Sequence, residues 1–464
     1  MGKIKKIFFA LCLATSSLLV VTSAYSATAK AGASCSPKGK TQVVGSVKFT
    51  CVLSNKKLVW NKGVKVSPPT TTTTVPALPK LTALGSSAPC RLPYSNPNDP
   101  WGNWSDGFSD RSHRLPSTGT VKSIVLFVDF PGDSATSATI PQRLIDYTQQ
   151  TTAFYKSESF GKLNLQFTAY PKILHITTDP TTYGMTNAVK YNPDGTPKAN
   201  NSNQYLQDAL NAGLNAGVDF SGYVNVIVIP PKDNITIEFG PGVTWGVPLN
   251  PNIPNIYNAV LGQKEQASML PWVWLAHELS NNMGLQEPWG VNTPIKNVWS
   301  ISFVGGVDLL WGGGLPIFDG IESLGWEKWL LGWVSDSQVA CVDTISTSIF
   351  DLAPLETTDS GTKIISIKLN THKTIVVEYR TTAGFDSVPA GYSGAFVYTV
   401  DTSMNSDLTP SDPSFVALGT KMYSPTNQLV GTIQAGESIT YQGNTISILS
   451  MDNKNLYVKV VTGN

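Results

Sequence analysis

The clearest chemical content of the chain lies in the stretch WLAHELSNNMGLQEPW, residues 274–289, where His277 and Glu278 stand side by side. In a zinc hydrolase helix, histidines at positions i and i+4 reach one metal ion from the same helix face. The glutamate after the first histidine activates the metal-bound water. Four residues after His277, however, stands Asn281. The stretch therefore has the frame of a zinc site without its second imidazole.

The rest of this frame is present. A third ligand of such sites follows a glycine that turns the chain, and the spacing HExxHxxGxx(H/D) puts Gly284 at the turn and Glu287 at the ligand. Pro271 can begin the helix, and Gly284 can end it in a left-handed conformation. The amide oxygen of Asn281 is a hard and weakly basic donor, whereas zinc prefers nitrogen or thiolate. We therefore expect the helix to persist and its metal chemistry to be weakened.

No other histidine is expected to replace the missing ligand. The chain has four histidines, and besides His277 these are His113, His175 and His372. Their surroundings, SDRSHRL, KILHITT and NTHKT, contain no second ligand at metal-binding spacing. We interpret all three as ordinary surface or packed residues.

The elements that would position this helix follow an α/β order. VKSIVLFVDF (121–130) and YVNVIVIPP (223–231) have the apolar composition of buried strands, and a helical segment begins near residue 140 between them. A strand, a helix, a second strand and then the helix with His277 predict an α/β domain. From about residue 344 the chain changes to short strands that alternate with period two, which is typical of a β-sandwich.

Composition bounds the class of protein. A chain of 464 residues has room for several domains. Charged residues make up 14% and the formal net charge is +1, so no basic face for nucleic acid is implied.

Residues 1–29 read as a signal peptide, with lysines before the apolar run IFFALCLATSSLLVV. No later segment has about 18 consecutive apolar residues, so we expect a secreted or envelope-associated protein without a transmembrane anchor.

Four cysteines remain after the signal peptide, and an even number in an exported protein favours disulfides. Three pairings are possible. Proximity and domain layout favour Cys35 with Cys51 and Cys90 with Cys341.

The segment before the main domains divides into a module and a linker. Residues 30–63 contain two short strand-like runs and Trp60, a core so small that it needs a disulfide staple. Its lysines either contact an anionic cell envelope or form the solvated face of a spacer. Residues 64–84 contain five consecutive threonines flanked by prolines and are expected to be an extended linker.

Five segments in order across roughly residues 85–460 resemble one family. They are SIVLFVDFPGD, FYKSESFGKLNLQF, HELSNNMGLQE, SLGWEKWLLGWV and IVVEYRTTAGFDSVPAGYSGAFVYTVD. Together they look like the immune-inhibitor-A-like family of secreted bacterial zinc metallopeptidases. The resemblance implies a metzincin-like catalytic-type domain over residues 85–342 and a β-sandwich over residues 343–464.

The resemblance also implies a cofactor and roles. Zinc would be held by His277 and Glu287, and Glu278 would be the general base. Three positions depart from the family. Asn281 replaces the second zinc histidine, Glu287 replaces an aspartate, and Leu310 replaces the methionine of the turn beneath the metal.

Two functions follow from this pattern. The first is a metallopeptidase-like protein with a degenerate site, inactive or very weak as a peptidase, with zinc absent or weakly bound. Such a protein would act by binding an extracellular protein or a cell-envelope component. The second is a working zinc endopeptidase in which His277, Glu287 and a non-standard ligand hold the metal, with Glu278 as base. Ligand chemistry favours the first.

Overall fold

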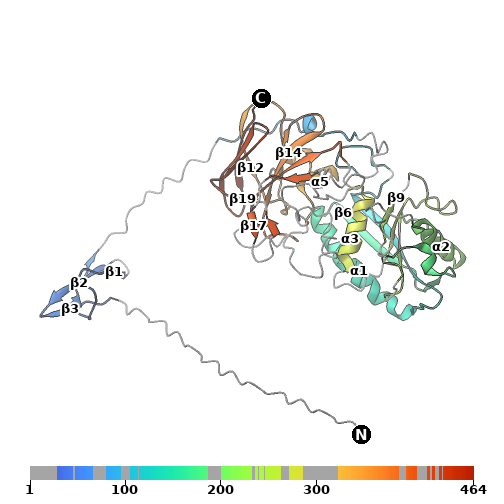
Figure 1. The fold of residues 1–464 in the computed structure, drawn as a ribbon, viewed down its shortest axis with the longest axis horizontal. Helices are drawn as coiled ribbons and strands as arrows, with labels where there is room; N and C mark the ends of the chain where they lie inside the picture. Colours follow the sequence, from blue (N-terminus) through green and yellow to red (C-terminus); the bar gives the residue numbers. More distant parts are fainter. Residues whose placement is uncertain are drawn as a thin grey trace, which may run out of the picture. The chain divides into compact units, whose positions relative to one another are not determined.

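The computed structural model describes most of residues 29–464. It leaves out segments 45–46, 66–79, 96–104, 113, 187–199, 233–235, 239, 245, 263–270, 286–321, 386–392, 405–414, 419–420, 424–427, 431 and 464. The chain forms two compact units, Met1–Leu78 and Pro79–Asn464 (Figure 1).

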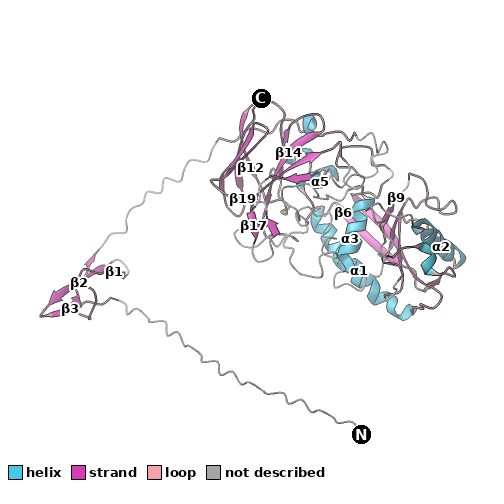
Figure 2. Ribbon diagram, viewed as in Figure 1, coloured by secondary structure: helices cyan, strands magenta, loops and turns pink. Residues whose placement is uncertain are grey.

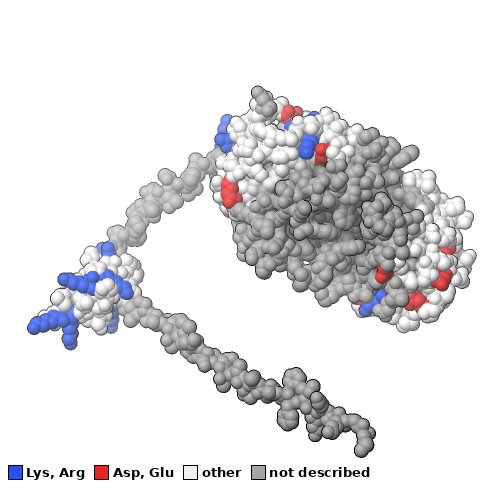
Figure 3. All heavy atoms as spheres, in the orientation of Figure 1, with Lys and Arg blue, Asp and Glu red and all other residues white. Residues whose placement is uncertain are grey.

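The first unit is a small antiparallel sheet. Its strands are β1 (Thr41–Val44), β2 (Val47–Ser54), β3 (Lys57–Trp60) and β4 (Val64–Lys65). The other three strands all pair with β2. Cys51 and Trp60 face each other across β2 and β3 and are buried together with Ala29. A disulfide joins Cys35 to Cys51, which staples this minimal core. Figure 3 shows lysine side chains projecting from it.

The N-terminal sheet of the second unit is mostly parallel. Its strands are β5 (Gly119–Asp129), β6 (Leu163–Ala169), β7 (Leu174–His175), β8 (Asn225–Ile229), β9 (Gly242–Thr244) and β10 (Asn258–Leu261). The order is β6-β5-β8-β10-β9, with β7 paired to β5. Every pair is parallel except β9 with β10, so the sheet ends in an antiparallel edge strand.

Helices cover both faces of this sheet (Figure 2). The helices are α1 (Ile140–Glu158), α2 (Ser202–Asn215) and α3 (Pro271–Asn282). Val125 and Phe127 of β5 pack in one core with α1 and α3, whereas Leu126 and Val128 pack in another with α2. Because both faces are buried, the strand is a nearly continuous apolar run.

Two further sheets form the C-terminal part. One contains β11 (Val339–Val342), β13 (Ile364–Lys368), β14 (Lys373–Arg380), β15 (Gly394–Asp401), β16 (Phe415–Ala417) and β19 (Thr432–Ile433). The other contains β12 (Thr347–Leu352), β20 (Ser438–Tyr441), β21 (Asn444–Met451) and β22 (Leu456–Val461). A separate pair consists of β17 (Lys421–Tyr423) and β18 (Gln428–Val430).

Short helices complete the described elements. They are α5 (Gly325–Leu330), η1 (Ala88–Cys90), η2 (Ser137–Thr139), η3 (Pro180–Tyr183) and η6 (Asp336–Gln338). Within the described ranges, no helix combines the length and apolarity needed to cross a membrane.

The two C-terminal sheets pack face to face. Ile375 and Val377 of β14 share one core with Phe350 of β12 and Val458 of β22. Val376, which points to the opposite face of β14, packs in another core with tryptophans of α5. The sheet that contains β14 is therefore covered on both faces, which explains why TIVVEYR is apolar without clear alternation.

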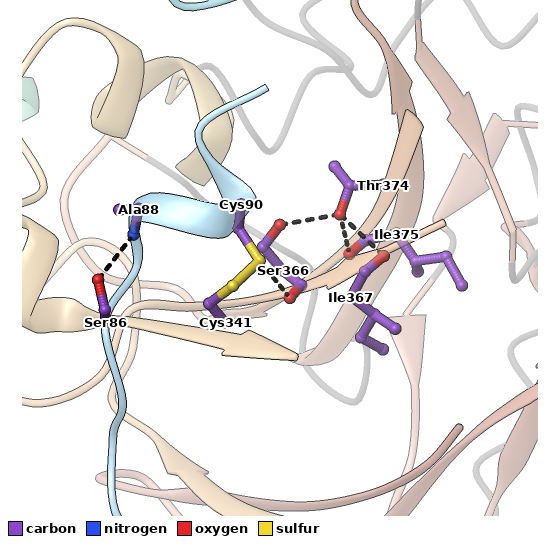
Figure 4. Close-up of a disulfide and its surroundings, with 8 residues drawn as sticks. All are labelled: Ser86, Ala88, Cys90, Cys341, Ser366, Ile367, Thr374 and Ile375. Atoms are coloured by element: carbon purple, nitrogen blue, oxygen red, sulfur yellow. Dashed lines mark hydrogen bonds between the residues drawn. A yellow bond between two sulfur atoms is a disulfide. The ribbon is translucent and has the colours of Figure 1, made fainter. Parts of the chain in front are cut away.

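A second disulfide joins Cys90 of η1 to Cys341 of β11 (Figure 4). Cys90 is fully buried, and its Sγ lies 3.4 Å from the carbonyl oxygen of Ser366 in the neighbouring strand β13. Both disulfides have the pairing that the sequence favoured. β11 precedes residue 343 but belongs to the C-terminal sheet, so this bond ties the start of the second unit to that sheet.

Removal of the longer disulfide should strongly destabilise the second unit. The bond closes a loop with a sequence separation of 251 residues, and the chain-entropy model gives about 5 kcal/mol for such a loop. We expect the double variant Cys90→Ser, Cys341→Ser to lower the free energy of unfolding, measured by urea titration, by up to that amount. The matched double variant Cys35→Ser, Cys51→Ser lies in the other unit and should leave this transition unchanged. Equal losses in both variants would contradict the two-unit description.

Limited proteolysis should separate the two units. Both ends of the predicted linker 64–84 form hydrogen bonds with the neighbouring unit. At its start, β4 pairs with β2. Near its end, the Thr82 amide donates to the Ile349 carbonyl at 2.7 Å, and the Ile349 amide donates to Thr82 Oγ1 at 3.0 Å. A Pro/Thr tract buries little apolar surface, so we expect the first cuts between residues 66 and 79. Mass spectrometry should find a stable fragment that begins just before Thr82. First cuts between residues 120 and 285 would refute the expectation.

Candidate functional site

The helix with His277 begins and ends as predicted. α3 begins at Pro271. Gly284 follows its last turn with φ of 88°, in the left-handed region. The Gly284 amide donates to the carbonyl of Asn281 at 2.8 Å, and the Leu285 amide donates to that of Ser280 at 3.2 Å. These two bonds form a Schellman motif, so the local sequence specifies where the helix ends.

Two arginines that the sequence reasoning passed over hold this helix end. Arg111 Nη2 donates to the carbonyl of Met283 at 2.5 Å, and Arg114 Nη1 donates to that of Gly284 at 2.9 Å. Burial, reinforced by Arg114, lowers the pKa of Arg111 to about 9, so it stays charged at neutral pH. A Cβ at position 284 would lie 1.6 Å from Arg114 Nη1. Gly284 is thus required by close approach as well as by φ.

α1 fixes another side of α3. The Tyr155 hydroxyl donates to the carbonyl of Ala276 at 2.6 Å and lies 2.6 Å from Ser280 Oγ. Thr151 Oγ1 donates to the carbonyl of Trp272 at 3.1 Å. Burial raises the pKa of Tyr155, so it remains a neutral donor. These bonds fix the rotation of α3 about its axis. They therefore also fix the directions of the side chains of His277 and Asn281, which follow Ala276 and Ser280 in the sequence.

His277 and Asn281 contact each other one turn apart on α3. Asn281 Nδ2 lies 3.1 Å from His277 Nε2, and the His277 side chain is 5% exposed. If the amide nitrogen faces the ring, it donates to Nε2; if the amide is reversed, its oxygen accepts from Nε2–H. In either arrangement the Nε2 atom of His277 is engaged by Asn281.

Glu278 binds the edge strand of the sheet. Its Oε2 accepts a 2.5 Å hydrogen bond from the amide of Gly242 in β9. The Leu261 amide donates to the Pro241 carbonyl, so the alternation of an antiparallel pair directs the Gly242 amide away from β10. A Cβ at position 242 would lie 2.7 Å from the carbonyl oxygen of Glu278, so glycine permits this contact. Glu278 therefore fastens β9 to α3.

A second polar link between α3 and the sheet was not anticipated. Asn282 Nδ2 donates to the carbonyl of Ala259 at 2.9 Å. Thr244 Oγ1 lies 2.7 Å from Asn258 Oδ1 and 3.2 Å from Asn282 Oδ1. The sequence signal for this link was the pair of asparagines at positions 281 and 282. A polar residue on the buried side of a helix needs hydrogen-bond partners, so the pair could have predicted a polar contact with the sheet. The last turn of α3 is thus tied to both β9 and β10.

The described residues do not include a complete set of zinc ligands at this place. They offer one imidazole, the amide of Asn281 and the carboxylate of Glu278, whose Oε1 lies 4.0 Å from His277 Nε2, whereas structural and catalytic zinc sites hold the metal with at least three protein ligands. Across the described ranges, no group of three or more His, Cys, Asp or Glu side chains is placed to bind a metal. Glu287, Leu310 and His113 lie outside the described residues.

Each of the two other described histidines has a polar partner that is not a metal-site residue. His175 lies on β7, with Nδ1 2.6 Å from Asp129 Oδ1, and its side chain is 77% exposed. His372 lies in the turn between β13 and β14, with Nδ1 3.2 Å from the carbonyl oxygen of Pro93.

Perturbed pKa values of acidic residues also occur in a buried charge cluster elsewhere. Lys328 of α5 lies 2.7 Å from Glu322 and 3.6 Å from Glu158 at the end of α1. Burial would lower the pKa of Lys328, but the two glutamates raise it overall. Burial opposes ionisation of Glu322, yet Lys328 holds its pKa below the usual value. Burial raises the pKa of Glu158 to about 8 against the weaker attraction of Lys328.

This cluster continues into the C-terminal sheet. Glu378 of β14 accepts hydrogen bonds from the Gly325 amide at 2.7 Å and from the Tyr398 hydroxyl at 2.9 Å. Arg380 donates to Glu378 Oε1 at 2.6 Å and to the carbonyl of Glu322 at 3.2 Å. Perturbed pKa values often mark functional sites. Here the charged groups are buried and bind one another, so we interpret the cluster as a structural fastening of α1 and α5 to β14 and β15.

A scan against models of known protein families matches none of them, and a search among curated proteins finds no match. What the chain does must therefore be argued from its own residues.

The pH dependence of stability should carry the signature of Glu158. Its folded pKa of about 8 exceeds the usual value of 4.5, so the folded state binds more protons between these values. The stability contribution is complete below pH 4.5 and is lost as the pH rises through 8. We expect Glu158→Gln to flatten the change in unfolding free energy between about pH 5 and about pH 9 by about 1 kcal/mol or more. Asp146→Asn, an exposed change on the same helix, should leave the slope intact.

Proposed function

We propose that this chain is a secreted metallopeptidase-like protein of the immune-inhibitor-A-like family whose zinc site is degenerate. It acts by binding an extracellular protein or a cell-envelope component and not by cleaving peptides. The five family-like segments support the family assignment. The mixed α/β architecture, in which the helix of His277 packs on a mostly parallel sheet, supports the catalytic-type domain that the resemblance implies.

The contact between Asn281 and His277 carries the proposal. A zinc ion would need the lone pair of an imidazole nitrogen, and Nε2 of His277 is engaged by the Asn281 amide at 3.1 Å. Asn281 itself offers only a weakly basic oxygen. The side chains of His277 and Asn281, which stand where two zinc ligands would be, instead form a hydrogen bond with each other.

Glu278 supports the same conclusion. A general base needs a metal-polarised water within hydrogen-bond reach. Oε2 of Glu278 instead accepts the outward amide of Gly242. That amide lies on the outer side of β9, the last strand of this sheet among the described residues, where an extended peptide would otherwise pair. Glu278, the expected general base, therefore holds β9 in place. The same hydrogen bond occupies the Gly242 amide, so that amide cannot pair with another strand.

Restoring the second imidazole should restore metal binding. We expect the unmodified mature protein to purify with far less than one zinc per chain and to leave casein uncut. Asn281→His places an imidazole one turn from His277 and should raise zinc affinity by at least about tenfold, because even changes beyond the direct ligands cost about 10- to 100-fold. Metal content after dialysis against zinc, measured by atomic emission, checks this. Gln149→His, on the exposed surface of α1, controls for an added histidine.

The rival endopeptidase makes the opposite prediction. Stoichiometric zinc in the unmodified protein, with casein cleavage abolished both by a chelator and by Glu278→Gln, would overturn the proposal. Those results would establish a zinc endopeptidase that uses His277, Glu287 and a non-standard ligand.

A further inference from the structure

The near-zero net charge of the chain hides a separation of charge along the sequence. No aspartate or glutamate occurs before Asp99, whereas 12 lysines and Arg91 do. The whole chain has 33 basic and 32 acidic residues, so residues 99–464 contain 20 basic and 32 acidic residues, a net charge of −12. The net positive charge is therefore confined to the 98 residues before Asp99, and the rest of the chain is acidic in sum.

The lysine module, defined here as residues 29–65, contains eight of these lysines and no acidic residue. All eight are exposed: Lys30, Lys38, Lys40, Lys48, Lys56, Lys57, Lys62 and Lys65. With no carboxylate in the module, none of them can form an ion pair within it. A folded body of 37 residues thus carries eight positive charges that its own residues do not neutralise.

The lysines surround the module and do not form one flat face. Lys48 pairs with Val64, and Val47 pairs with Lys65. Because adjacent residues of a strand point to opposite faces, Lys48 and Lys65 project from opposite faces of the sheet. Lys56 lies at the tip of the β2–β3 hairpin, whereas Lys40 precedes β1. Figure 3 likewise shows lysines pointing in several directions from the module.

These features favour one class of partner. A planar bilayer can touch only one face, whereas a flexible chain can follow charges on both faces. Lysine is a point charge and, unlike arginine, does not select a planar bidentate group, so the module would recognise charge density. Trp60 is only 6% exposed and Phe49 is half-buried, so the module lacks the open aromatic surface on which nucleic-acid bases stack.

We infer that the lysine module is an electrostatic anchor that attaches the chain to a flexible polyanion with repeated phosphate or carboxylate groups. The Pro/Thr sequence between residues 66 and 79 then tethers the acidic second unit to that polymer. The acidic unit would be repelled by the same polymer, so attachment depends on the module. This inference is independent of the state of the His277 site.

The test uses the full mature chain and two polyanions, inorganic polyphosphate and polyglutamate. We expect both to bind with Kd of about 1 to 100 µM at physiological salt and to weaken at least tenfold between about 50 and about 200 mM salt, because binding releases counterions. Isothermal titration and fluorescence anisotropy measure these constants. Failure of either polymer to bind would overturn recognition by charge density.

Matched lysine variants locate the binding. Replacing Lys48, Lys56, Lys57 and Lys62 by glutamine, or instead Lys30, Lys38, Lys40 and Lys65, should each raise Kd at least about tenfold. Replacing four exposed lysines of the second unit, Lys122, Lys172, Lys232 and Lys454, should change Kd less than about twofold. A comparable loss in this control would refute the assignment to the module. All substituted side chains are exposed, and peptide mapping of the Cys35–Cys51 bond verifies folding.

Two further ligands separate the rival partners. Vesicles containing phosphatidylglycerol should bind at least about tenfold more weakly than polyphosphate of equal charge. Tight vesicle binding that depends on only one lysine set would replace the polymer with a lipid surface. Single-stranded DNA should bind no more tightly than polyphosphate of equal charge, and a preference above about tenfold would indicate base recognition and overturn the inference.

Discussion

The buried ion cluster around Lys328 is the constraint on which the second unit depends. Moving a charge out of water costs several kcal/mol, so each buried charge must find partners. Lys328 from α5 finds its ionised partner in Glu322, 2.7 Å away, whereas Glu158 at the end of α1 lies 3.6 Å away and burial raises its pKa. Glu378 on β14 binds the start of α5 in the same region. Removing Glu322 would leave the buried charge of Lys328 without its nearest partner, so the cluster favours the packing in which α1, α5 and the C-terminal sheet meet here.

That fixed frame positions α3. Hydrogen bonds from α1 and from the segment of Arg111 and Arg114 hold the helix on two sides, and β9 and β10 hold it on a third. In such a buried setting each polar side chain needs a hydrogen-bond partner. Asn281 binds His277, and Glu278 binds Gly242. The polar side chains of this turn of α3 are thus satisfied by each other and by β9, and these contacts hold the helix in place.

The two units differ in the sign of their net charge as well as in their fold. The first is a small stapled sheet with only lysines as charged residues, and the second is acidic in sum. Separating these charges on two bodies joined by a Pro/Thr tract lets one body meet a polyanion that the other would repel. The site on α3 and the lysine module therefore contribute different interactions to a protein that we propose acts by binding.

Local rules in the sequence determined what depends on neighbouring residues. Pro271 and Gly284 set the ends of α3, apolar runs marked β5 and β8, and the proximity of Cys35 to Cys51 in the sequence favoured the first disulfide. The domain layout, not a local rule, favoured the pairing of Cys90 with Cys341. The tertiary structure decided what depends on residues far apart. It placed β11 in the C-terminal sheet, brought Arg114 to Gly284, directed Glu278 to Gly242 and buried Lys328 among three elements. Helix caps and strand periodicity involve residues a few positions apart, so a single sequence reveals them. Which buried polar group meets which partner is set by how the whole chain closes its core, and no local pattern encodes that choice.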